Sequence, residues 1–195
     1  MKKIVFDCDD VLHDLNGKLC RENGINIEKI TVFNIYQSSM LTQREKETLM
    51  GCYKNAETFA HIDWYPEAER LHEIQEAGGD IFINSNCFNE KTAYYKKQQL
   101  LKLGIPEDHI FLNIITQPDS HKGVGEDIFI NVDDHPFNIV NSSAEINVLM
   151  DKPWNHSKEA EKELDGCSYS RVLNLGDAID FILLCLHKEQ ENMVL

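Results

Sequence analysis

Pairs of aspartates directly follow two short apolar segments of the chain. KKIVF is followed by Asp7 and Asp9, and IFINV runs into Asp133 and Asp134. Carboxylate oxygens are hard ligands of the kind that Mg²⁺ prefers, and a carboxylate can also act as a nucleophile or as a general acid–base. The four aspartates are therefore candidates for a metal site and for catalysis.

A hydroxyl group, an amide and a lysine stand in two further polar segments. INSN contains Ser85 and Asn86, and HKG contains Lys122. A hydroxyl and a lysine suit the non-bridging oxygens of a phosphate, because the first donates a hydrogen bond and the second also supplies positive charge. These segments add a candidate phosphate-binding site to the acidic one.

The apolar segments beside these polar residues have the length of buried strands, and helical patterns alternate with them. The pattern predicts strands at 2–6, 81–84, 110–115, 128–132 and 146–150, helices at 66–79, 89–103 and 176–190, and a polar loop with a short helical stretch at 151–170. Such alternation is typical of a parallel sheet covered on both faces. Since ligands bind outside the carboxyl ends of parallel strands, the polar segments should converge at one edge. An extended chain would also place Asp7 and Asp9 on one face.

The segment between the first two predicted strands is amphipathic and contains no convincing strand. Leu12, Leu15 and Leu19 have helical spacing, and Thr42 followed by Glu45 has the pattern of a capping box. The segment is therefore predicted to be a small helical insert. We expect a core domain formed by 1–12 and 66–195 and a helical cap formed by 13–65.

Taken in chain order, the motifs resemble those of the haloacid dehalogenase superfamily of phosphohydrolases. The order is DxDxV, a strand ending in Ser, a Lys, and a strand ending in DD. The helical insert, WYPEAERL before the second strand, and DKPWN after the strand that follows DD are similar to the 5′(3′)-deoxyribonucleotidase branch. The resemblance implies a Rossmann-like, doubly wound α/β sheet with a small helical cap that closes over the substrate.

The resemblance also implies catalytic and metal-binding roles. Asp7 matches the nucleophile that forms an aspartyl-phosphate, and Asp9 matches the general acid–base. Asp134 matches the carboxylate that binds Mg²⁺ together with Asp7 and the main-chain carbonyl of Asp9, and Asp133 is expected in or just behind that shell. Mg²⁺ is therefore the implied cofactor.

Phosphate binding is implied for the remaining motif residues. Ser85 matches the phosphate-binding hydroxyl, with Asn86 beside it, and Lys122 matches the cation that holds the nucleophile and the phosphoryl group together. The chain departs from the pattern at Asp10, where many relatives have Gly. This extra carboxylate either disturbs the geometry of the loop or adds charge near the site.

The implied substrate is a phosphate monoester, most specifically a nucleoside monophosphate such as a deoxyribonucleotide. Trp64, Tyr65, Phe33 and Tyr36 could stack on its base, or they could pack the insert onto the core. A phosphosugar or another small metabolite is the alternative substrate. A phosphate-binding protein without activity is a further alternative, as is a signalling receiver. Two features argue against a receiver: Lys122 precedes the strand that ends in DD, whereas a receiver's lysine lies on the last strand, and receivers lack so long an insert.

Composition restricts the partners. The formal charge is −14, from 19 basic and 33 acidic residues, which argues against a nucleic-acid polymer or an anionic membrane. The net charge does not exclude a ligand with a single phosphate group, because one metal ion and one lysine can neutralise that group locally. No apolar run reaches the roughly 18 residues that span a bilayer, and the apolar stretch at the N-terminus is too short for a signal peptide.

The six cysteines are scattered, with no CxxC pair and no zinc-type spacing. A chain of this length and apolar content does not need disulfides for its stability, so reduced thiols and a cytoplasmic location are expected. The expected partner is a small phosphate monoester, and a homodimer remains an alternative for the assembly.

Overall fold

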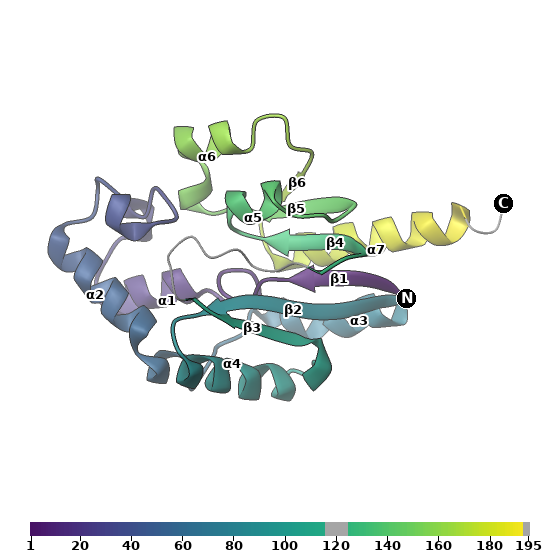
Figure 1. Cartoon of the computed structure of the whole chain (residues 1–195), viewed down its shortest axis with the longest axis horizontal. Helices are drawn as coiled ribbons and strands as arrows, with labels where there is room; N and C mark the ends of the chain where they lie inside the picture. Colours follow the sequence, from purple (N-terminus) through teal and green to yellow (C-terminus); the bar gives the residue numbers. More distant parts are fainter. Residues whose placement is uncertain (116–124, 193–195) are drawn as a thin grey trace.

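The chain folds around one parallel six-stranded sheet. The computed structural model describes residues 1–115 and 125–192, and the strand order is β3-β2-β1-β4-β5-β6 (Figure 1). The predicted doubly wound α/β fold is confirmed. Lys122 lies outside the described residues. The strands are β1 (Lys2–Phe6), β2 (Gly79–Cys87), β3 (Ile110–Ile114), β4 (Ile128–Asp133), β5 (Ile146–Met150) and β6 (Ser170–Val172).

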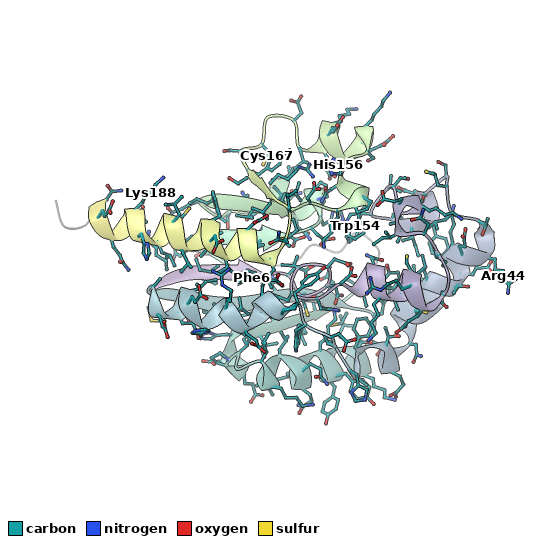
Figure 2. The ribbon with its side chains drawn as sticks, turned by 180° about the vertical axis from the view of Figure 1, so that it is seen from behind. Phe6, Arg44, Trp154, His156, Cys167 and Lys188 are labelled. Carbon is teal, nitrogen blue, oxygen red and sulfur yellow. The ribbon has the colours of Figure 1, made fainter. Side chains whose placement is uncertain are left out.

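Helices cover the sheet because its central strands are apolar on both faces. Every residue of β4 is buried, as expected for a strand in the middle of a covered parallel sheet. α3 and α7 contact each other and lie across one face (Figures 1 and 2), α4 packs against β2 and β3, and α5 packs against β4 and β5. The helices are α1 (Leu15–Glu22), α2 (Gln43–Lys54), α3 (Leu71–Glu76), α4 (Glu90–Lys102), α5 (Pro136–Val140), α6 (Lys158–Glu163) and α7 (Leu175–Asn192).

Several predicted boundaries differ from those of the structure, and one strand was not predicted. The helix expected at 66–79 begins as a 3₁₀ turn (Pro66–Arg70) and ends at Glu76, whereas Gly79 already belongs to β2. Glycine is required there because a Cβ atom at residue 79 would lie 2.5 Å from the Ile74 side chain. β6 begins at Ser170, the last residue of the expected polar loop, and it is short and only partly buried, so it shows no apolar pattern.

The segment 13–65 lies at the end of the sheet to which the strands point (Figure 1). Its two ends meet, because His13 and Trp64 form an isolated antiparallel bridge. The predicted capping box of α2 is present, with Thr42 and Glu45 bonding to each other's backbone. A separate hydrophobic cluster, which includes Leu19, Leu49 and Phe59, holds the segment together.

Two sequence expectations concern the whole chain. No helix within residues 1–115 and 125–192 is long and apolar enough to cross a membrane. All six cysteines are free thiols. The absence of disulfides means that the buried core and its hydrogen bonds, rather than covalent links, hold the fold together.

Candidate active site

Three carboxylates meet where β1 and β4 end. Oxygens of Asp7, Asp133 and Asp134 lie within 4.8 Å of one another, and all three residues are buried. They meet because β1 and β4 are neighbouring parallel strands, with Phe6 in register with Val132. The backbone N–H of Asp7 donates to the carbonyl of Val132 at 2.9 Å, which fixes the end of β1 against β4. The predicted acidic motifs are therefore brought together as expected.

Asp133 is held by the turn into α5. Its Oδ1 accepts hydrogen bonds from the backbone N–H of His135 at 2.8 Å and from the Asn138 amide at 3.0 Å, and the same amide lies 3.1 Å from Oδ2. The N-cap of α5 is His135, so neither aspartate serves as the helix cap. These bonds hold Asp133 in the acidic group, which is formed by Asp7, Asp133 and Asp134. They also satisfy a buried carboxylate that would destabilise the fold if it had no hydrogen-bond partners.

Asp134 is held by the DKPWN segment, a role that the sequence analysis did not assign. The indole Nε1–H of Trp154 donates to Asp134 Oδ2 at 2.8 Å, and the amide of Asn155 donates to the Asp134 carbonyl at 3.0 Å. Trp154 and Asn155 are buried, and the Trp154 ring also packs into the cluster of the insert (Figure 2). The segment therefore positions one acid of the site and joins the core to the insert.

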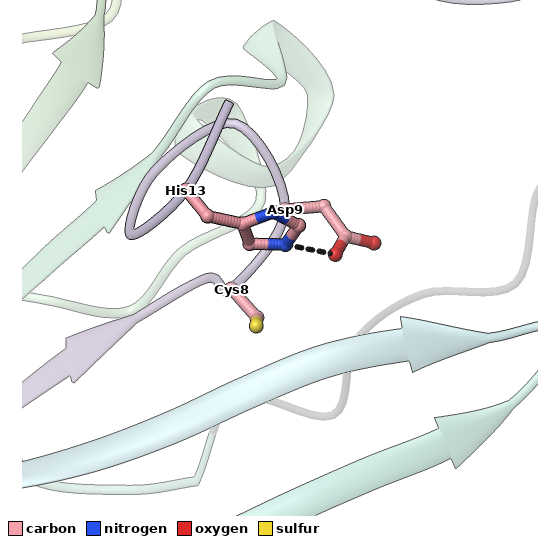
Figure 3. Close-up of side chains that lie close together, drawn as sticks. All are labelled: Cys8, Asp9 and His13. Carbon is pink, nitrogen blue, oxygen red and sulfur yellow. Dashed lines mark hydrogen bonds and ion pairs between the residues drawn. The ribbon is translucent and has the colours of Figure 1, made fainter. Parts of the chain in front are cut away.

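Asp9 lies close to the acidic group in sequence but makes different contacts. Its Oδ2 accepts from Lys96 Nζ at 2.6 Å, and its Oδ1 accepts from His13 Nε2 at 2.9 Å (Figure 3). Burial alone would raise the pKa of Asp9, but the Lys96 ammonium and the His13 hydrogen bond hold that pKa well below its usual range. Asp9 is therefore a carboxylate in this arrangement.

Cys8 lies between Asp7 and Asp9 in the sequence, and its side chain lies close to those of Asp9 and His13 (Figure 3). Cys8, Asp9 and His13 offer ligand atoms within 4.8 Å of one another, as a second metal site would require. However, burial and the neighbouring Asp9 raise the pKa of the Cys8 thiol well above its usual value. The three carboxylates are the harder donor set, and their oxygens suit Mg²⁺ better than a thiol does.

Ser85 and Asn86 belong to β2 itself rather than to the turn after it. They pair in register with Leu112 and Asn113 of β3. Ser85 Oγ lies 3.3 Å from Lys96 Nζ, and the carbonyl of Asn86 accepts from the same ammonium at 3.0 Å. The predicted hydroxyl therefore shares a cation with Asp9, and that cation is Lys96 of α4, which the sequence analysis missed.

Asp10 is turned toward the insert. Its backbone has a φ of 58°, in the left-handed region where Gly is favoured and Asp is tolerated. The Asp10 carboxylate accepts from the backbone N–H of Asn16 at 2.9 Å and from its side-chain amide at 2.6 Å, and the Tyr53 hydroxyl donates to Asn16. Burial raises the pKa of Asp10 to about 7, although Lys152 and the Asn16 backbone bond lower it. Asp10 thus ties the first loop to α1.

We expect Asp10→Ala to be less stable than Asp10→Gly by about 1 kcal/mol. Both variants lose the same carboxylate and the same hydrogen bonds to Asn16, so these losses cancel in the comparison. Only Ala must hold a Cβ atom at a left-handed φ. Urea unfolding of the two variants measures the difference, and equal midpoints with equal slopes would show that the loop relaxes out of this conformation.

The four candidate aromatic residues separate into two groups. Trp64 stands edge-on to His13 at 5.7 Å between ring centroids, and it packs against the main core together with Tyr65. Tyr65 also accepts a hydrogen bond from Lys152 through its hydroxyl. Phe33 instead stacks on His135, with ring centroids 3.5 Å apart, and remains 48% exposed.

Among these four aromatic residues, Phe33 is therefore the one that contacts His135, the residue directly after Asp133 and Asp134. Tyr36 lies on the same insert and is similarly exposed, at 46%, but its ring stacks on no other ring among the described residues. The geometry thus favours a packing role for Trp64 and Tyr65. It leaves Phe33 as the aromatic candidate beside the site.

The donor set fits a magnesium ion. Three carboxylates that share one buried location repel each other unless a cation is present, and their oxygens are ligands of the kind that Mg²⁺ prefers. Asp7, Asp133 and Asp134 supply this set at the carboxyl ends of β1 and β4. They could hold one ion and leave coordination positions for water or a phosphate oxygen.

Comparison with known proteins identifies the fold. No family model and no curated protein matches the sequence. A haloacid dehalogenase-like hydrolase from Burkholderia xenovorans is 14% identical, with a TM-score of 0.51 and coverage of 91% of this chain and 97% of that chain. A structure described as a dehalogenase has a TM-score of 0.55 at 16% identity and covers 93% and 96%. A haloacid dehalogenase-like hydrolase from Streptococcus pneumoniae has a TM-score of 0.55 at 13% identity and covers 93% and 98%.

The chain therefore has the haloacid dehalogenase-like fold over nearly its whole length. This finding agrees with the fold that the four motifs implied. At such low identities the similarity defines the architecture, so the reaction must be argued from the residues of the site.

Proposed function

We propose that this protein is a Mg²⁺-dependent phosphatase that hydrolyses a phosphate monoester through an aspartyl-phosphate on Asp7. The observation that supports the proposal most strongly is the group formed by Asp7, Asp133 and Asp134 at the carboxyl edge of the sheet. Ser85 of the neighbouring strand β2 adds a hydroxyl. A carboxylate nucleophile, a metal-binding acid pair and a hydrogen-bond donor are the groups that such a reaction needs.

In the proposed reaction, a carboxylate oxygen of Asp7 attacks phosphorus, and the bond to the leaving oxygen breaks. Because Asp9 is a carboxylate in this arrangement, the leaving oxygen takes its proton from solvent, and Asp9 then accepts a proton from the water that attacks the aspartyl-phosphate. Cleavage of the bond between phosphorus and Asp7 returns the electron pair to the carboxylate and releases phosphate. Bound Mg²⁺ would neutralise charge on the transferring group, held by Asp7, Asp133 and Asp134.

A phosphate-release screen with Mg²⁺ tests the proposal. Purified protein is incubated with nucleoside monophosphates, phosphosugars and p-nitrophenyl phosphate, and a parallel arm measures halide release from 2-haloacids. We expect phosphate release and no halide release. Halide release without phosphate release would replace the proposal with a dehalogenase function, and the absence of both would overturn it.

Among phosphate monoesters, we propose a nucleoside monophosphate as the substrate. Phe33 supports this choice, because an exposed ring from the insert stands on His135, directly after the acidic pair. A nucleobase could lie on such a ring while its phosphate reaches the acidic group. Stacking of this kind is worth roughly 1–3 kcal/mol per base.

Phe33→Ala is therefore expected to lower kcat/KM for a nucleoside monophosphate by about tenfold or more. The same variant should hardly affect p-nitrophenyl phosphate, which lacks a nucleobase. Tyr36→Ala is the matched control, since Tyr36 lies on the same insert with similar exposure. Steady-state kinetics on both substrates gives the answer.

Other outcomes redirect the substrate assignment. If Phe33→Ala slows both substrates equally, the ring positions the insert rather than a base. If it affects neither, or if a phosphosugar is the best substrate of the wild type, the site is that of another phosphate monoester.

A further inference from the structure

Lys96 is a buried lysine at the centre of the candidate site. Its side chain is 0% exposed, although Lys is among the residues least often buried. It lies on α4 at helical spacing with Thr92 and Leu100, the other buried residues of that helix. The Phe59 ring of the insert lies 5.0 Å from Nζ. A core position of α4 therefore carries a cation into the contact between the core and the insert.

All three hydrogens of the Lys96 ammonium have acceptors. They are Asp9 Oδ2 at 2.6 Å, Asn86 O at 3.0 Å and Ser85 Oγ at 3.3 Å. An ammonium group has three donors and no acceptor capacity. Lys96 is thus satisfied by the protein itself, and this arrangement leaves no donor for a substrate oxygen. Its geometry is that of a group that holds other residues in place.

The contacts also determine what the two motif residues can do. Because Lys96 and His13 only donate to it, Asp9 is a hydrogen-bond acceptor at both oxygens, and a carboxylate has further lone pairs with which to accept a proton. Because Ser85 Oγ accepts from Lys96, the hydroxyl hydrogen of Ser85 is directed to another acceptor. Asp9 is arranged as a base, and Ser85 as a donor.

We propose that Lys96 is a positioning residue that holds Asp9 for the second half of the reaction, the hydrolysis of the aspartyl-phosphate. This inference rests on the proposed phosphatase function. In that step the water oxygen bonds to phosphorus, one water proton passes to Asp9, and the bond between phosphorus and Asp7 breaks with its electrons returning to Asp7. Asp9 afterwards loses the proton to solvent. Lys96 touches no reacting atom and acts through Asp9.

The test separates the two chemical steps with p-nitrophenyl phosphate, whose good leaving group needs little protonation. In Lys96→Met, nitrophenolate should appear in a burst stoichiometric with active sites, followed by turnover about a hundredfold slower than that of the wild type. Phosphorylated protein should accumulate and be visible by mass spectrometry. Lys97→Met is the matched control, because Lys97 is the next residue of α4 and is partly exposed in an ion pair with Glu107.

A double-mutant cycle shows whether Lys96 acts through Asp9. Lys96→Met added to Asp9→Asn should slow turnover by less than about threefold, since the group that Lys96 positions is already absent. Multiplicative losses, or a slower burst without accumulated phosphoprotein, would overturn the inference. Lys96→Gln is the second variant if Lys96→Met does not fold, and failure of both to fold would show that the lysine is only structural. If the wild type releases no phosphate, the proposed function itself fails.

Discussion

Asp7→Asn is expected to abolish phosphate release while leaving the fold intact. An amide cannot attack phosphorus and form the aspartyl-phosphate, so turnover should fall by at least about a thousandfold. The fold should survive because Asp7 Oδ1 accepts a hydrogen bond from the backbone N–H of Cys8 at 2.7 Å, and an asparagine oxygen can accept the same bond. The variant also removes one negative charge from a crowded acidic group.

Phosphate release and thermal unfolding of the same preparation measure this result. Asp63→Asn is the matched control, because it makes the same chemical change on an exposed side chain that is paired with Lys18. It should keep wild-type turnover. If folded Asp7→Asn retains more than about a tenth of the wild-type rate, Asp7 is not the nucleophile.

The sheet and its acidic edge could be predicted because both depend on local pattern. IFINV is apolar at every position except Asn131, and β4 is buried throughout. Once parallel strands are expected, their carboxyl ends must share an edge, which brings Asp7 to Asp133 and Asp134. The expectation that Asp7 and Asp9 share one face of an extended chain stays a prediction, because β1 ends at Phe6 and neither aspartate belongs to the strand.

The supporting residues could not be predicted in the same way, since their contacts join distant parts of the chain. Lys96 bonds to Asp9 across 87 residues of sequence, and Trp154 bonds to Asp134 across 20. The available signal for Lys96 was its position on the face of a helix otherwise buried at Thr92 and Leu100. Lys122, the cation chosen from motif order, lies outside the described residues and stays a prediction.

The sequence left open whether Asp10 disturbs the geometry of the first loop or adds charge near the site. Its carboxylate bonds to Asn16 at the start of α1, and it is not part of the acidic group. The loop keeps the left-handed turn that Gly would adopt, and the extra side chain adds a tie to the insert. The hypothesis that the protein only binds phosphate, because Asp10 disrupts the site, therefore loses its main support.

Removal of divalent ions is expected to abolish activity, and Mg²⁺ should restore it better than Ca²⁺. Asp7, Asp133 and Asp134 place three carboxylates in one buried group, which a substrate phosphate cannot approach without a neutralising cation. Ca²⁺ takes more ligands at longer distances than Mg²⁺, so it should hold the phosphate too far from Asp7. Phosphate release after EDTA treatment and re-addition of each ion measures the effect.

Asp134→Ala and Asp10→Ala form the comparison that locates the ion. Asp134→Ala removes a member of the acidic group and should raise the Mg²⁺ concentration for half-maximal activity by at least about tenfold, since it deletes one of three carboxylate ligands. Asp10→Ala should leave that concentration nearly unchanged, because Asp10 faces Asn16. Full activity in chelator or equal rescue by Ca²⁺ would contradict the proposed magnesium site, and an equal shift in the two variants would place the ion elsewhere. A shift confined to Asp134→Ala would tie the metal dependence to the acidic edge formed by β1 and β4.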